Sequence, residues 1–450
     1  MLTLKIILAK LIIFAIKVIG LVTKKEQGSN LTGKIMLKLD KNLVRKFKGL
    51  NYNNVFFVTG TNGKSSTVNI LVHVLKESGF KVVSNLEGAN LLSGICTSLL
   101  KSCSINGNVN ADYFVFETDE RYLNSIVNNI PGKNLAVTNI QKDQVQRNGD
   151  PDYIYQKIKN SIREDMTLYL NNDEPRTKSL ESCSENVFYY GLNRHEKSFE
   201  KNGFMDVTMA CPKCSDKLVF DYYNIDNVGK YSCSACGFAP SPDGARIESV
   251  DLNNNSFDML GDTFHLPYSE PFMLYNYSLS VTLLKNLGIT SENISKALKS
   301  FIKPKGRTAT LEYKDKKIHY IKIKQENPET LQSSFDVVSF DKEKKVLLIG
   351  LMVVGDIVPN YTNIFYAFDC NVKPLIASNV EKIICFGEPV AYDVANRFIY
   401  AGAEEKIKVL CSDDPKEIFR EIDNYDSSQV YLITWTKSFF EMQEYLKNQK

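Results

Sequence analysis

The strongest constraint on the fold is a segment near residue 55 in which a strand, a glycine loop and a helix follow one another. Positions 53 to 60 read NNVFFVTG, a β-branched and aromatic run that predicts a strand. The next residues, TNGKSSTVNILVHVLKESG, carry apolar side chains at helical spacing and end in a glycine. This order brings loop N–H groups and the positive end of a helix to one point, which suits a phosphate group.

The residues of the loop indicate a nucleotide site. Lys64 is placed to reach terminal phosphates, and the Ser65 hydroxyl to hold Mg²⁺. The alternative is a glycine turn that only joins strand to helix, and the variable part is indeed shorter than in the commonest P-loop pattern. The lysine and two hydroxyl residues directly after the turn favour the nucleotide site. We therefore expect ATP-binding residues Gly60, Thr61, Asn62, Gly63, Lys64, Ser65 and Ser66.

Polar side chains also follow the next two predicted strands. DYFVFETDE ends in Glu117, Asp119 and Glu120, and LAVTNI contains Asn139 at its end. Open α/β sheets bind ligands at the carboxyl edge of their strands, so we expect Glu117 to hold Mg²⁺ together with Ser65 and Asn139 to lie at the nucleotide. Solvated charges at loop tips are the alternative for any one of these residues, but three successive polar strand ends disfavour it.

Four of the ten cysteines form a metal-type pattern. CPKC and CSACG are separated by eighteen residues, which gives C-x₂-C-x₁₈-C-x₂-C, a spacing typical of zinc. Two disulfides would need an oxidising compartment, and a redox C-x₂-C does not explain two copies. Four ligands leave no open position, so we expect a structural zinc ribbon at about 205–240. The predicted ligands are Cys211, Cys214, Cys233 and Cys236.

Charge gives little indication of a nucleic-acid partner. The chain has 55 Lys and Arg residues against 52 Asp and Glu residues, for a formal net charge of +3. Zinc ribbons can bind nucleic acid, but Lys213, Lys217 and Lys230 are the basic residues of this one, which is thin for a phosphate footprint. We therefore expect no nucleic-acid partner.

The N-terminal segment MLTLKIILAKLIIFAIKVIGLV predicts a helix that does not span a bilayer. Lys5, Lys10 and Lys17 divide it into apolar runs that are too short, and no small-residue cleavage site follows. The helix either lies on the cytoplasmic leaflet or docks on its own domain, and we favour the second. The expected location is the cytoplasm, with the inner face of the membrane as the further alternative.

The C-terminal part predicts a second α/β unit. The strands VLLIGLMVV, KIICFG, KIKVLC and VYLITW alternate with helical patterns, as in a small Rossmann-like domain. It has no glycine fingerprint of its own. We therefore expect it to close over substrate or to carry a partner, and not to bind a second nucleotide.

GTNGKSST, FETDE, TNIQKDQVQRNGD and NNDEP resemble the ATP-binding central domain of the Mur ligases. The leader LTGKIMLKLDKNLVRKF, the segment EGANLLSGI, the cysteine ribbon and the C-terminal part resemble most closely the MurT family, so that the similarity covers essentially the whole chain. It implies an α/β fold: a Mur-ligase-type P-loop ATPase domain with an inserted Cys₄ zinc ribbon, plus a C-terminal Rossmann-like domain. The expected domains are an N-terminal helix and leader at 1–50, the central domain at 51–307 and the C-terminal domain at 308–450.

The resemblance also implies an activity. MurT-type subunits use ATP and Mg²⁺ to convert the α-carboxyl of D-glutamate in the lipid II stem peptide to an amide through an acyl phosphate, so Lys64 and Glu117 are expected catalytic residues. This chain shows no Cys-His pair of glutaminase type, so the ammonia must come from another subunit or from solution. The resemblance implies a heterodimer with a class I glutaminase-like subunit of the GatD type, with lipid II as the substrate. Two alternatives remain: a Mur-like ligase for another carboxylate and amine, and a nucleotide-gated zinc-ribbon binding protein.

By the same resemblance, Asn276 and Arg307 contact the nucleotide, and Gly306 with Arg307 marks the hinge before the last domain. Asn276 as a helix cap and Arg307 as an exposed charge are the alternatives. The segment GDIVPNYTNIFYAFD matches the MurT stretch whose aspartate completes the partner's Cys-His-Asp triad. Asp369 is the expected counterpart and Asp356 the second candidate, while a surface carboxylate in a diverged segment is the alternative for Asp369.

Overall fold

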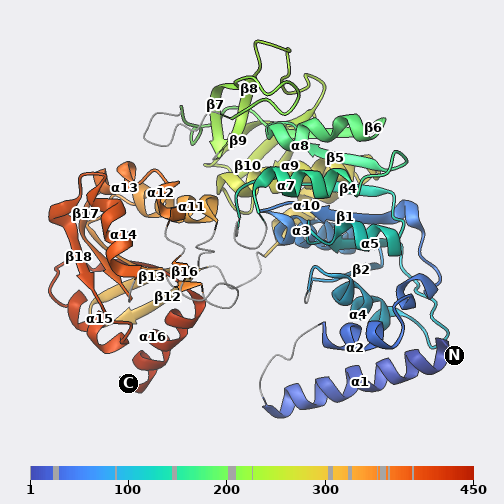
Figure 1. The fold of residues 1–450 in the computed structure, drawn as a ribbon, viewed down its shortest axis with the longest axis horizontal. Coiled ribbons are helices and arrows are strands. Elements are labelled where there is room, and N and C mark those ends of the chain that lie inside the picture. Colours follow the sequence, from blue (N-terminus) through green and yellow to red (C-terminus); the bar gives the residue numbers. More distant parts are fainter. Residues whose placement is uncertain are drawn as a thin grey trace. The chain divides into compact units, whose positions relative to one another are not determined.

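The computed structural model describes residues 2–23, 30–86, 89–143, 149–200, 209–225, 227–302, 308–322, 327–351, 353–354, 361–362, 365–387 and 390–449. The chain divides into two compact units. The first comprises 1–141, 148–201 and 208–303, and the second comprises 142–147, 202–207 and 304–450. Figure 1 shows both units.

The first unit is built on a nine-stranded mixed sheet in the order β11-β10-β9-β6-β5-β4-β1-β3-β2. Its strands are β1 (Val55–Thr59), β2 (Val82–Ser84), β3 (Tyr113–Glu117), β4 (Asn134–Val137), β5 (Thr167–Asn171), β6 (Asn186–Leu192), β9 (Ala245–Asp251), β10 (Ser256–Met259) and β11 (Asp262–His265). The pairs from β2 to β9 are parallel, whereas β9, β10 and β11 pair antiparallel. Strand β1 therefore lies inside the sheet with parallel neighbours on both sides.

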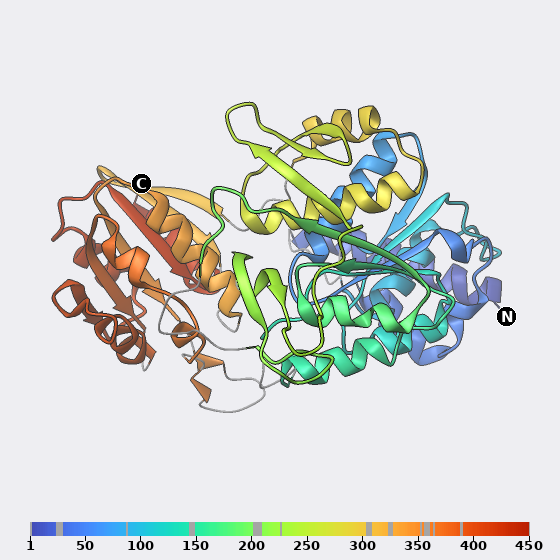
Figure 2. The ribbon, with the colours of Figure 1, turned by 90° about the horizontal axis from the view of Figure 1, so that it is seen from above.

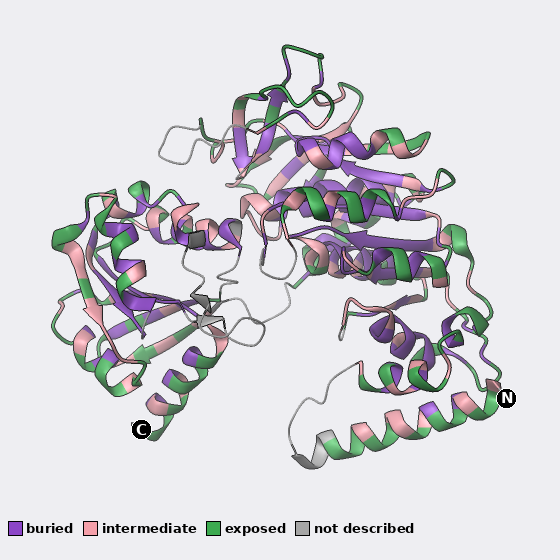
Figure 3. Ribbon diagram, in the orientation of Figure 1, coloured by how far each residue is buried: buried purple, intermediate pink, exposed green. Residues whose placement is uncertain are grey.

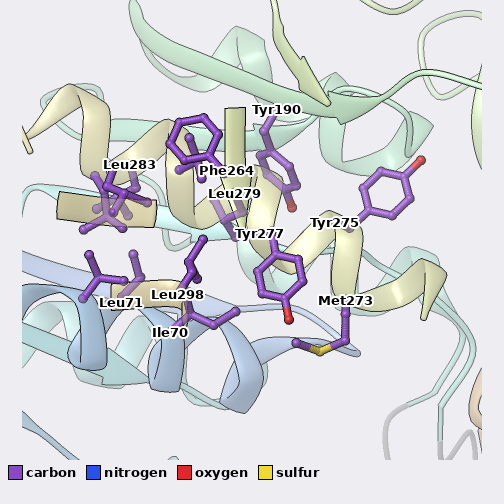
Figure 4. Close-up of a cluster of buried hydrophobic side chains, with 14 of the residues drawn as sticks. Ile70, Leu71, Tyr190, Phe264, Met273, Tyr275, Tyr277, Leu279, Leu283 and Leu298 are labelled. Atoms are coloured by element: carbon purple, nitrogen blue, oxygen red, sulfur yellow. The ribbon is translucent and has the colours of Figure 1, made fainter. Parts of the chain in front are cut away.

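Helices cover both faces of this sheet (Figures 1 and 2). Phe56 and Val58 of β1 belong to the core cluster under α3, α9 and α10, whereas Val55 and Phe57 belong to the cluster under α4, α5 and α7. Side chains that alternate between two buried faces explain why β1 is apolar at nearly every position. Figure 4 shows Leu71 and Leu283 in the first cluster. These helices are α3 (Lys64–Glu77), α4 (Leu92–Ser102), α5 (Leu123–Asn129), α7 (Pro151–Lys159), α9 (Pro271–Asn286) and α10 (Ser291–Ser300).

The N-terminal helix α1 (Leu2–Thr23) packs against α2 (Leu31–Leu39) and α4. Ile6 and Ala9 are fully buried, and the Lys5 ammonium lies 2.7 Å from the Asp40 carboxylate that follows α2. The expectation that this helix docks on its own domain is confirmed. Within the described part of the chain, every helix falls short of the length and apolarity required to cross a bilayer.

The remaining elements of the first unit are short. The cysteine-bearing insert contains an antiparallel hairpin of two strands, separate from the large sheet. These elements are η1 (Leu43–Lys46), η2 (Tyr52–Asn54), α8 (Pro175–Ser179), η3 (Leu180–Cys183), β7 (Val219–Ile225) and β8 (Val228–Ser232).

The second unit contains a six-stranded sheet in the order β12-β13-β19-β14-β17-β18. All its pairs are parallel except the antiparallel pair of β12 with β13. Every residue of β14 is buried because its alternate side chains enter two separate core clusters (Figure 3). The strands predicted from KIICFG, KIKVLC and VYLITW are present as β17, β18 and β19. The strand predicted from VLLIGLMVV is shorter than expected, because β14 ends at Gly350 and Val353–Val354 belong to the separate two-stranded sheet of β15 and β16. The elements are β12 (Thr308–Tyr313), β13 (Lys316–Lys322), α11 (Pro328–Phe340), β14 (Lys345–Gly350), β15 (Val353–Val354), β16 (Tyr361–Thr362), α12 (Phe365–Phe368), α13 (Lys373–Ala377), β17 (Val380–Phe386), α14 (Val390–Ile399), η4 (Glu404–Lys406), β18 (Ile407–Leu410), α15 (Pro415–Ile422), β19 (Gln429–Thr434) and α16 (Thr436–Gln449).

Candidate functional site

Residues 60–63, here called the glycine loop, join the carboxyl end of β1 to the first turn of α3. Gly60 has φ +121° and Gly63 has φ +84°, conformations that favour glycine. A Cβ on Gly60 would lie 2.3 Å from Thr138 Oγ1 at the end of β4. The loop is therefore packed closely against the neighbouring strand end, and Gly63 forms the N-cap of α3.

The end of β4 holds the glycine loop by its backbone. Thr61 N–H donates to the Asn139 carbonyl at 2.8 Å, and Asn62 N–H donates to the Asn139 side-chain oxygen at 2.9 Å. Gln141 N–H in turn donates to the Thr61 hydroxyl at 2.9 Å. Asn139, predicted from its place at a strand end, thus fixes the shape of the loop, and Gln141 is a second support that sequence reasoning missed.

Asn276 meets the glycine loop from the opposite side. It is buried inside α9, six residues after the N-cap residue Glu270, so the interpretation of Asn276 as a helix cap is wrong. The Thr67 hydroxyl donates to its side-chain oxygen at 3.3 Å. A Cβ on Gly63 would lie 2.4 Å from the same oxygen. The side chain that the family resemblance selected is therefore in direct contact with the loop.

Replacing Gly63 with alanine is expected to destabilise the protein more than replacing Gly79 with alanine. Both glycines have positive φ, but a Cβ on Gly79 meets nothing within 4 Å. Gly79→Ala should cost about 1 to 2 kcal/mol of unfolding free energy from backbone strain alone, and Gly63→Ala a further 1 to 3 kcal/mol, roughly, from the clash. Chemical denaturation measures both. Adding Asn276→Ala should recover part of the difference, and equal costs for the two glycines would contradict this geometry.

Lys64 lies at the start of α3 with its ammonium folded over the glycine loop. Nζ donates to the carbonyls of Gly60 and Thr61, the latter at 3.2 Å, and lies 3.1 Å from Glu120 Oε2. The side chains of Lys64 and Glu120 are only 11% and 7% exposed. An anion that enters the loop therefore competes with the Glu120 carboxylate for this ammonium, at a partly desolvated position where charge interactions are strong. Sequence reasoning noted Glu120 but did not predict this pair.

Glu117 and Ser65 place a carboxylate and a hydroxyl near the same edge of the sheet. Glu117 is the last residue of β3 and pairs in register with Val58 of β1. The Asn85 side chain clamps its backbone by two hydrogen bonds of 2.9 Å. Ser65 is exposed on the first turn of α3. A hydroxyl and a carboxylate are ligand types that Mg²⁺ prefers, so the residues fit that ion.

Two buried carboxylates of the NNDEP segment brace the site. Glu174 caps α8 through the N–H groups of Arg176 and Thr177, and it also accepts from Ile140 N–H at 3.3 Å, just after Asn139. Burial raises the pKa of Glu174. Sequence reasoning quoted this segment only for its resemblance, although an acidic residue before a proline is a helix-start signal.

Asp173 connects three elements through its fully buried carboxylate. It lies 2.6 Å from Arg246 of β9, 3.0 Å from the Tyr275 hydroxyl of α9 and 2.8 Å from Leu192 N–H of β6. Burial raises its pKa, and Arg246 opposes that shift. Asp173 and Arg246 are 73 residues apart in the sequence, so no local sequence pattern predicts their contact.

The four predicted cysteine ligands converge on one point. All four Sγ atoms lie within 4.8 Å of one another, with Cys211 3.7 Å from Cys236 and Cys214 3.6 Å from Cys233. Each Cys-x₂-Cys turn ends in a residue with positive φ, Ser215 in one and Gly237 in the other. Cys211 and Cys233 are buried, whereas Cys214 and Cys236 are exposed.

These distances fit zinc and not disulfides. A tetrahedral site with Zn–S bonds of about 2.3 Å places its sulfurs roughly 3.8 Å apart, whereas a disulfide needs about 2.05 Å. All four cysteines are unpaired thiols. The donor set therefore suits a closed zinc site.

The cysteine cluster is tied to the first unit by charge. Lys213, inside CPKC, lies 3.1 Å from Glu181 of η3, and its ammonium lies 5.0 Å from the ring centroid of Phe238, just after CSACG. Burial works to raise the pKa of Glu181, but hydrogen bonds from Lys178, Tyr189 and Lys213 lower it overall. Lys213 thus connects its own cysteine turn, and through Phe238 the second turn, to the Glu181 carboxylate.

Asp369 lies in the second unit, in the turn after α12. It is partly exposed and lies 2.7 Å from the Lys142 ammonium, which belongs to the same unit. The buried Arg397 guanidinium donates to the carbonyl of Ala367 at 2.9 Å and to that of Cys370, so it fixes the turn on both sides of Asp369. Asp356, Gly306 and Arg307 lie outside the described residues.

The same unit holds a second polar contact that sequence reasoning missed. The buried Asn327 caps α11 by accepting from Thr330 N–H at 2.9 Å, and its amide donates to Asp143 at 3.1 Å. The N-P-x-T order at this position is a helix-start signal. Asp143 lies within TNIQKDQVQRNGD, so one end of this contact comes from a stretch that carries the Mur ligase resemblance.

Two family models match the chain, the Mur ligase middle domain at residues 58–221 and the MurT ligase C-terminal domain at residues 325–437. The lipid II isoglutaminyl synthase (glutamine-hydrolyzing) subunit MurT of Staphylococcus aureus (strain COL) is 27% identical over 382 residues, 84% of either chain. The subunit of the same name from Streptococcus pneumoniae (strain ATCC BAA-255 / R6) is 26% identical over 432 residues, 94% of this chain and 93% of that one.

Solved structures show the same fold. A pseudomurein peptide ligase type C from Methanothermus fervidus superposes with a TM-score of 0.65 at 20% identity, over 91% of this chain and 81% of that one. MurF from Acinetobacter baumannii gives 0.60 at 15% identity, over 92% and 80%. The fold and the matches thus define an ATP-dependent ligase of the Mur ligase type. Within that class, the chain is similar over most of its length to subunits named MurT, and its residues 325–437 match the MurT ligase C-terminal model.

Proposed function

We propose that this chain is the synthetase subunit of a lipid II isoglutaminyl synthase. It would amidate the α-carboxyl of D-glutamate in the lipid II stem peptide and so act in peptidoglycan synthesis. The observation that carries the proposal is the Lys64–Glu120 pair on the glycine loop, in a chain that is similar to MurT subunits over both units. A Mur-like ligase for another carboxylate and amine is the competing assignment.

In the first step, an oxygen of the substrate carboxylate attacks the γ-phosphorus of ATP. The bond from that phosphorus to the bridging oxygen breaks, ADP leaves, and an acyl phosphate forms. Negative charge builds on the phosphoryl oxygens, so catalysis consists mainly of positioning and charge neutralisation. The Lys64 ammonium and the positive end of α3 supply that neutralisation, with Asn139 and Asn276 fixing the loop.

In the second step, ammonia attacks the acyl carbon. The carbon–oxygen bond to the phosphate breaks, inorganic phosphate leaves with the electron pair, and the nitrogen loses a proton to solvent. The amide product is D-isoglutamine. No covalent bond to the protein is needed in either step, so Lys64 acts on charge alone.

Two metals complete the proposal. Mg²⁺ would be held by Ser65 and Glu117 and would neutralise charge on the phosphate oxygens of ATP. Zn²⁺ would be held in a structural ribbon by Cys211, Cys214, Cys233 and Cys236. This ribbon would be an insert in the P-loop ATPase domain. All four zinc positions would be filled by protein, so no reaction step involves this ion.

The test supplies purified protein with ATP, Mg²⁺, ammonium and lipid II. We expect ADP release that depends on lipid II, and a product whose mass is that of the amide. Absence of both phosphate release and amide would overturn the proposal. Activity with an amino acid in place of ammonium would support the competing ligase.

We propose further that the ammonia comes from a class I glutaminase-like subunit of the GatD type in a heterodimer, and that Asp369 completes its Cys-His-Asp triad. A carboxylate can orient the imidazole by accepting its second N–H. The Lys142 ammonium 2.7 Å away would first have to release one oxygen of Asp369.

Asp369→Asn is expected to separate the two nitrogen sources. With the partner present, glutamine-dependent amidation should fall by about 10²- to 10⁴-fold, because the imidazole loses its anionic partner. Ammonium-dependent amidation by the same preparation should keep its rate, because Asp369 takes no part in ATP chemistry. Lys142→Met is the matched variant, and it should leave the glutamine reaction active. Equal glutamine and ammonium rates in Asp369→Asn would contradict the triad role.

A further inference from the structure

Helix α1 is apolar on two faces, of which only one is covered. Ile6 and Ala9 are buried against the domain, whereas the other face exposes large apolar side chains. Figure 3 shows that much of α1 is exposed. The two most exposed near the middle are Leu11 at 61% and Phe14 at 67%. This apolar row consists of Leu4, Ile7, Leu8, Leu11, Phe14 and Val18.

The apolar row follows helical spacing and forms a continuous stripe. From Leu4 to Val18 it extends about 21 Å along the helix at 1.5 Å per residue. Exposed apolar patches of this length on a protein surface mark an interaction site. The docked face already accounts for the stability of the helix, so the second apolar face requires another partner.

The charge around α1 identifies the kind of partner. Residues 1–50 contain eleven Lys or Arg and two acidic residues, so this segment is strongly basic although the whole chain carries only +3. Lys17 on α1 is exposed, and Lys34, Lys38 and Lys41 line one hollow along α2 together with Leu31. Basic side chains beside an exposed apolar stripe are typical of helices that lie in the interface of an anionic membrane.

The acidic residue in the described part of this segment cancels only one of these positive charges. Asp40 lies 2.7 Å from the Lys5 ammonium and 2.6 Å from the Lys46 ammonium. Hydrogen bonds from Lys46 and Lys5 lower the pKa of Asp40 to about 2. Its charge is thus neutralised locally, while the exposed lysines of α2 keep theirs.

We propose that α1 and α2 form a membrane-docking surface, in which the apolar row enters an anionic lipid bilayer and the lysines contact its phosphate groups. The surface follows from residues 2–41 alone and needs none of the proposed chemistry. It deepens that function because it would hold the enzyme where a lipid-linked substrate lies. The helix would lie in the plane of the interface, since its buried face stays attached to the domain.

The test is co-sedimentation of the full-length protein with vesicles, without ATP or lipid II. We expect binding to vesicles of phosphatidylcholine mixed equally with phosphatidylglycerol, and weaker binding to phosphatidylcholine alone. Leu11→Asp with Phe14→Asp should lower the partition coefficient by at least about a hundredfold, since each large apolar side chain is worth about tenfold or more. Both positions are exposed, so the fold should tolerate the change.

The matched control removes two equally exposed aromatic side chains elsewhere. Tyr392→Asp with Tyr400→Asp, positions 60% and 76% exposed in the second unit, should bind vesicles like the unchanged protein. Lys34→Glu with Lys38→Glu should abolish the preference for phosphatidylglycerol. Equal binding by the α1 variant and the control would overturn the proposal. So would the absence of vesicle binding, or a dimer that the α1 variant converts to monomer, which would assign the row to a second copy.

Amidation of detergent-solubilised lipid II separates this proposal from the chemistry. The Leu11→Asp, Phe14→Asp variant should keep its rate there, because the substrate no longer needs a bilayer. Vesicle binding without amidation would overturn the proposed function alone. Amidation without vesicle binding would overturn the docking surface alone.

Discussion

Lys64→Ala is expected to reduce lipid II-dependent ADP release by about a thousandfold, because it removes the cation that neutralises the transferred phosphoryl group. Lys64 is the residue whose ammonium lies over the glycine loop, 3.2 Å from the Thr61 carbonyl and 3.1 Å from Glu120. The measurement is the steady-state rate of ADP release with ATP, ammonium and lipid II. Equilibrium binding of ATP should weaken as well, but by less than the rate.

Lys76→Ala is the matched control for this variant. Lys76 lies in the last turn of the same helix and is exposed, so its loss removes an equal charge far along α3 from the loop. Both variants should show the circular dichroism of the unchanged protein. A Lys64→Ala variant that retained most of its turnover would contradict the role of Lys64, and a folded Lys76→Ala variant as slow as Lys64→Ala would show that the effect is not local.

Cys233→Ser is expected to remove the zinc ion and unfold the ribbon. Cys233 is buried, and its sulfur lies 3.6 Å from Cys214, so a hydroxyl in its place leaves three thiolates and a poor fourth ligand. Structural zinc in comparable sites contributes about 10 to 16 kcal/mol to folding of the metal-bound form. We expect the unchanged protein to contain about one zinc per chain by mass spectrometry, and the variant to contain almost none.

The control is Cys183→Ser, which removes a thiol outside the cluster. It should retain zinc and the melting temperature of the unchanged protein. Chelation of the unchanged protein should lower activity in parallel with unfolding and not before it, because a closed four-ligand site takes no part in the reaction. Full zinc content in Cys233→Ser, or loss of activity that precedes any loss of structure, would contradict the structural assignment.

The elements that local sequence determines were predictable. The strand, glycine loop and helix from Val55 to Glu77 depend on a short apolar run, two glycines with positive φ and one periodic helix. The cysteine cluster depends on spacing within two tight turns. In each case the sequence pattern and the structure that it predicts lie within the same few residues, so the local conformation could be predicted from the pattern.

The contacts between distant segments were not predictable. Glu120 was one of three candidate carboxylates, and only the packing of β3 beside β1 decides which one meets Lys64. Asn139 was recognised from its place at a strand end, whereas its hydrogen bonds to the glycine loop depend on the register of β4. The Asp173–Arg246 pair joins β5 and β9 only after the sheet has formed.

The near-neutral net charge likewise concealed an uneven distribution. The net charge of the whole chain indicated no partner. The first 50 residues, however, are strongly basic, and α1 within them has an exposed apolar row. Periodicity predicted the helix, but which of its apolar faces would be covered depended on α2 and α4, which follow later in the chain.

The most direct test of the central claim uses lipid II labelled with oxygen-18 in the α-carboxyl of its D-glutamate. If the carboxylate attacks the γ-phosphorus of ATP, one labelled oxygen moves to inorganic phosphate for each amide formed. We therefore expect mass spectrometry to find the label in phosphate in proportion to product. Phosphate released without label, while ATP is consumed, would show that water and not the carboxylate had attacked, and would contradict the proposed ligase chemistry.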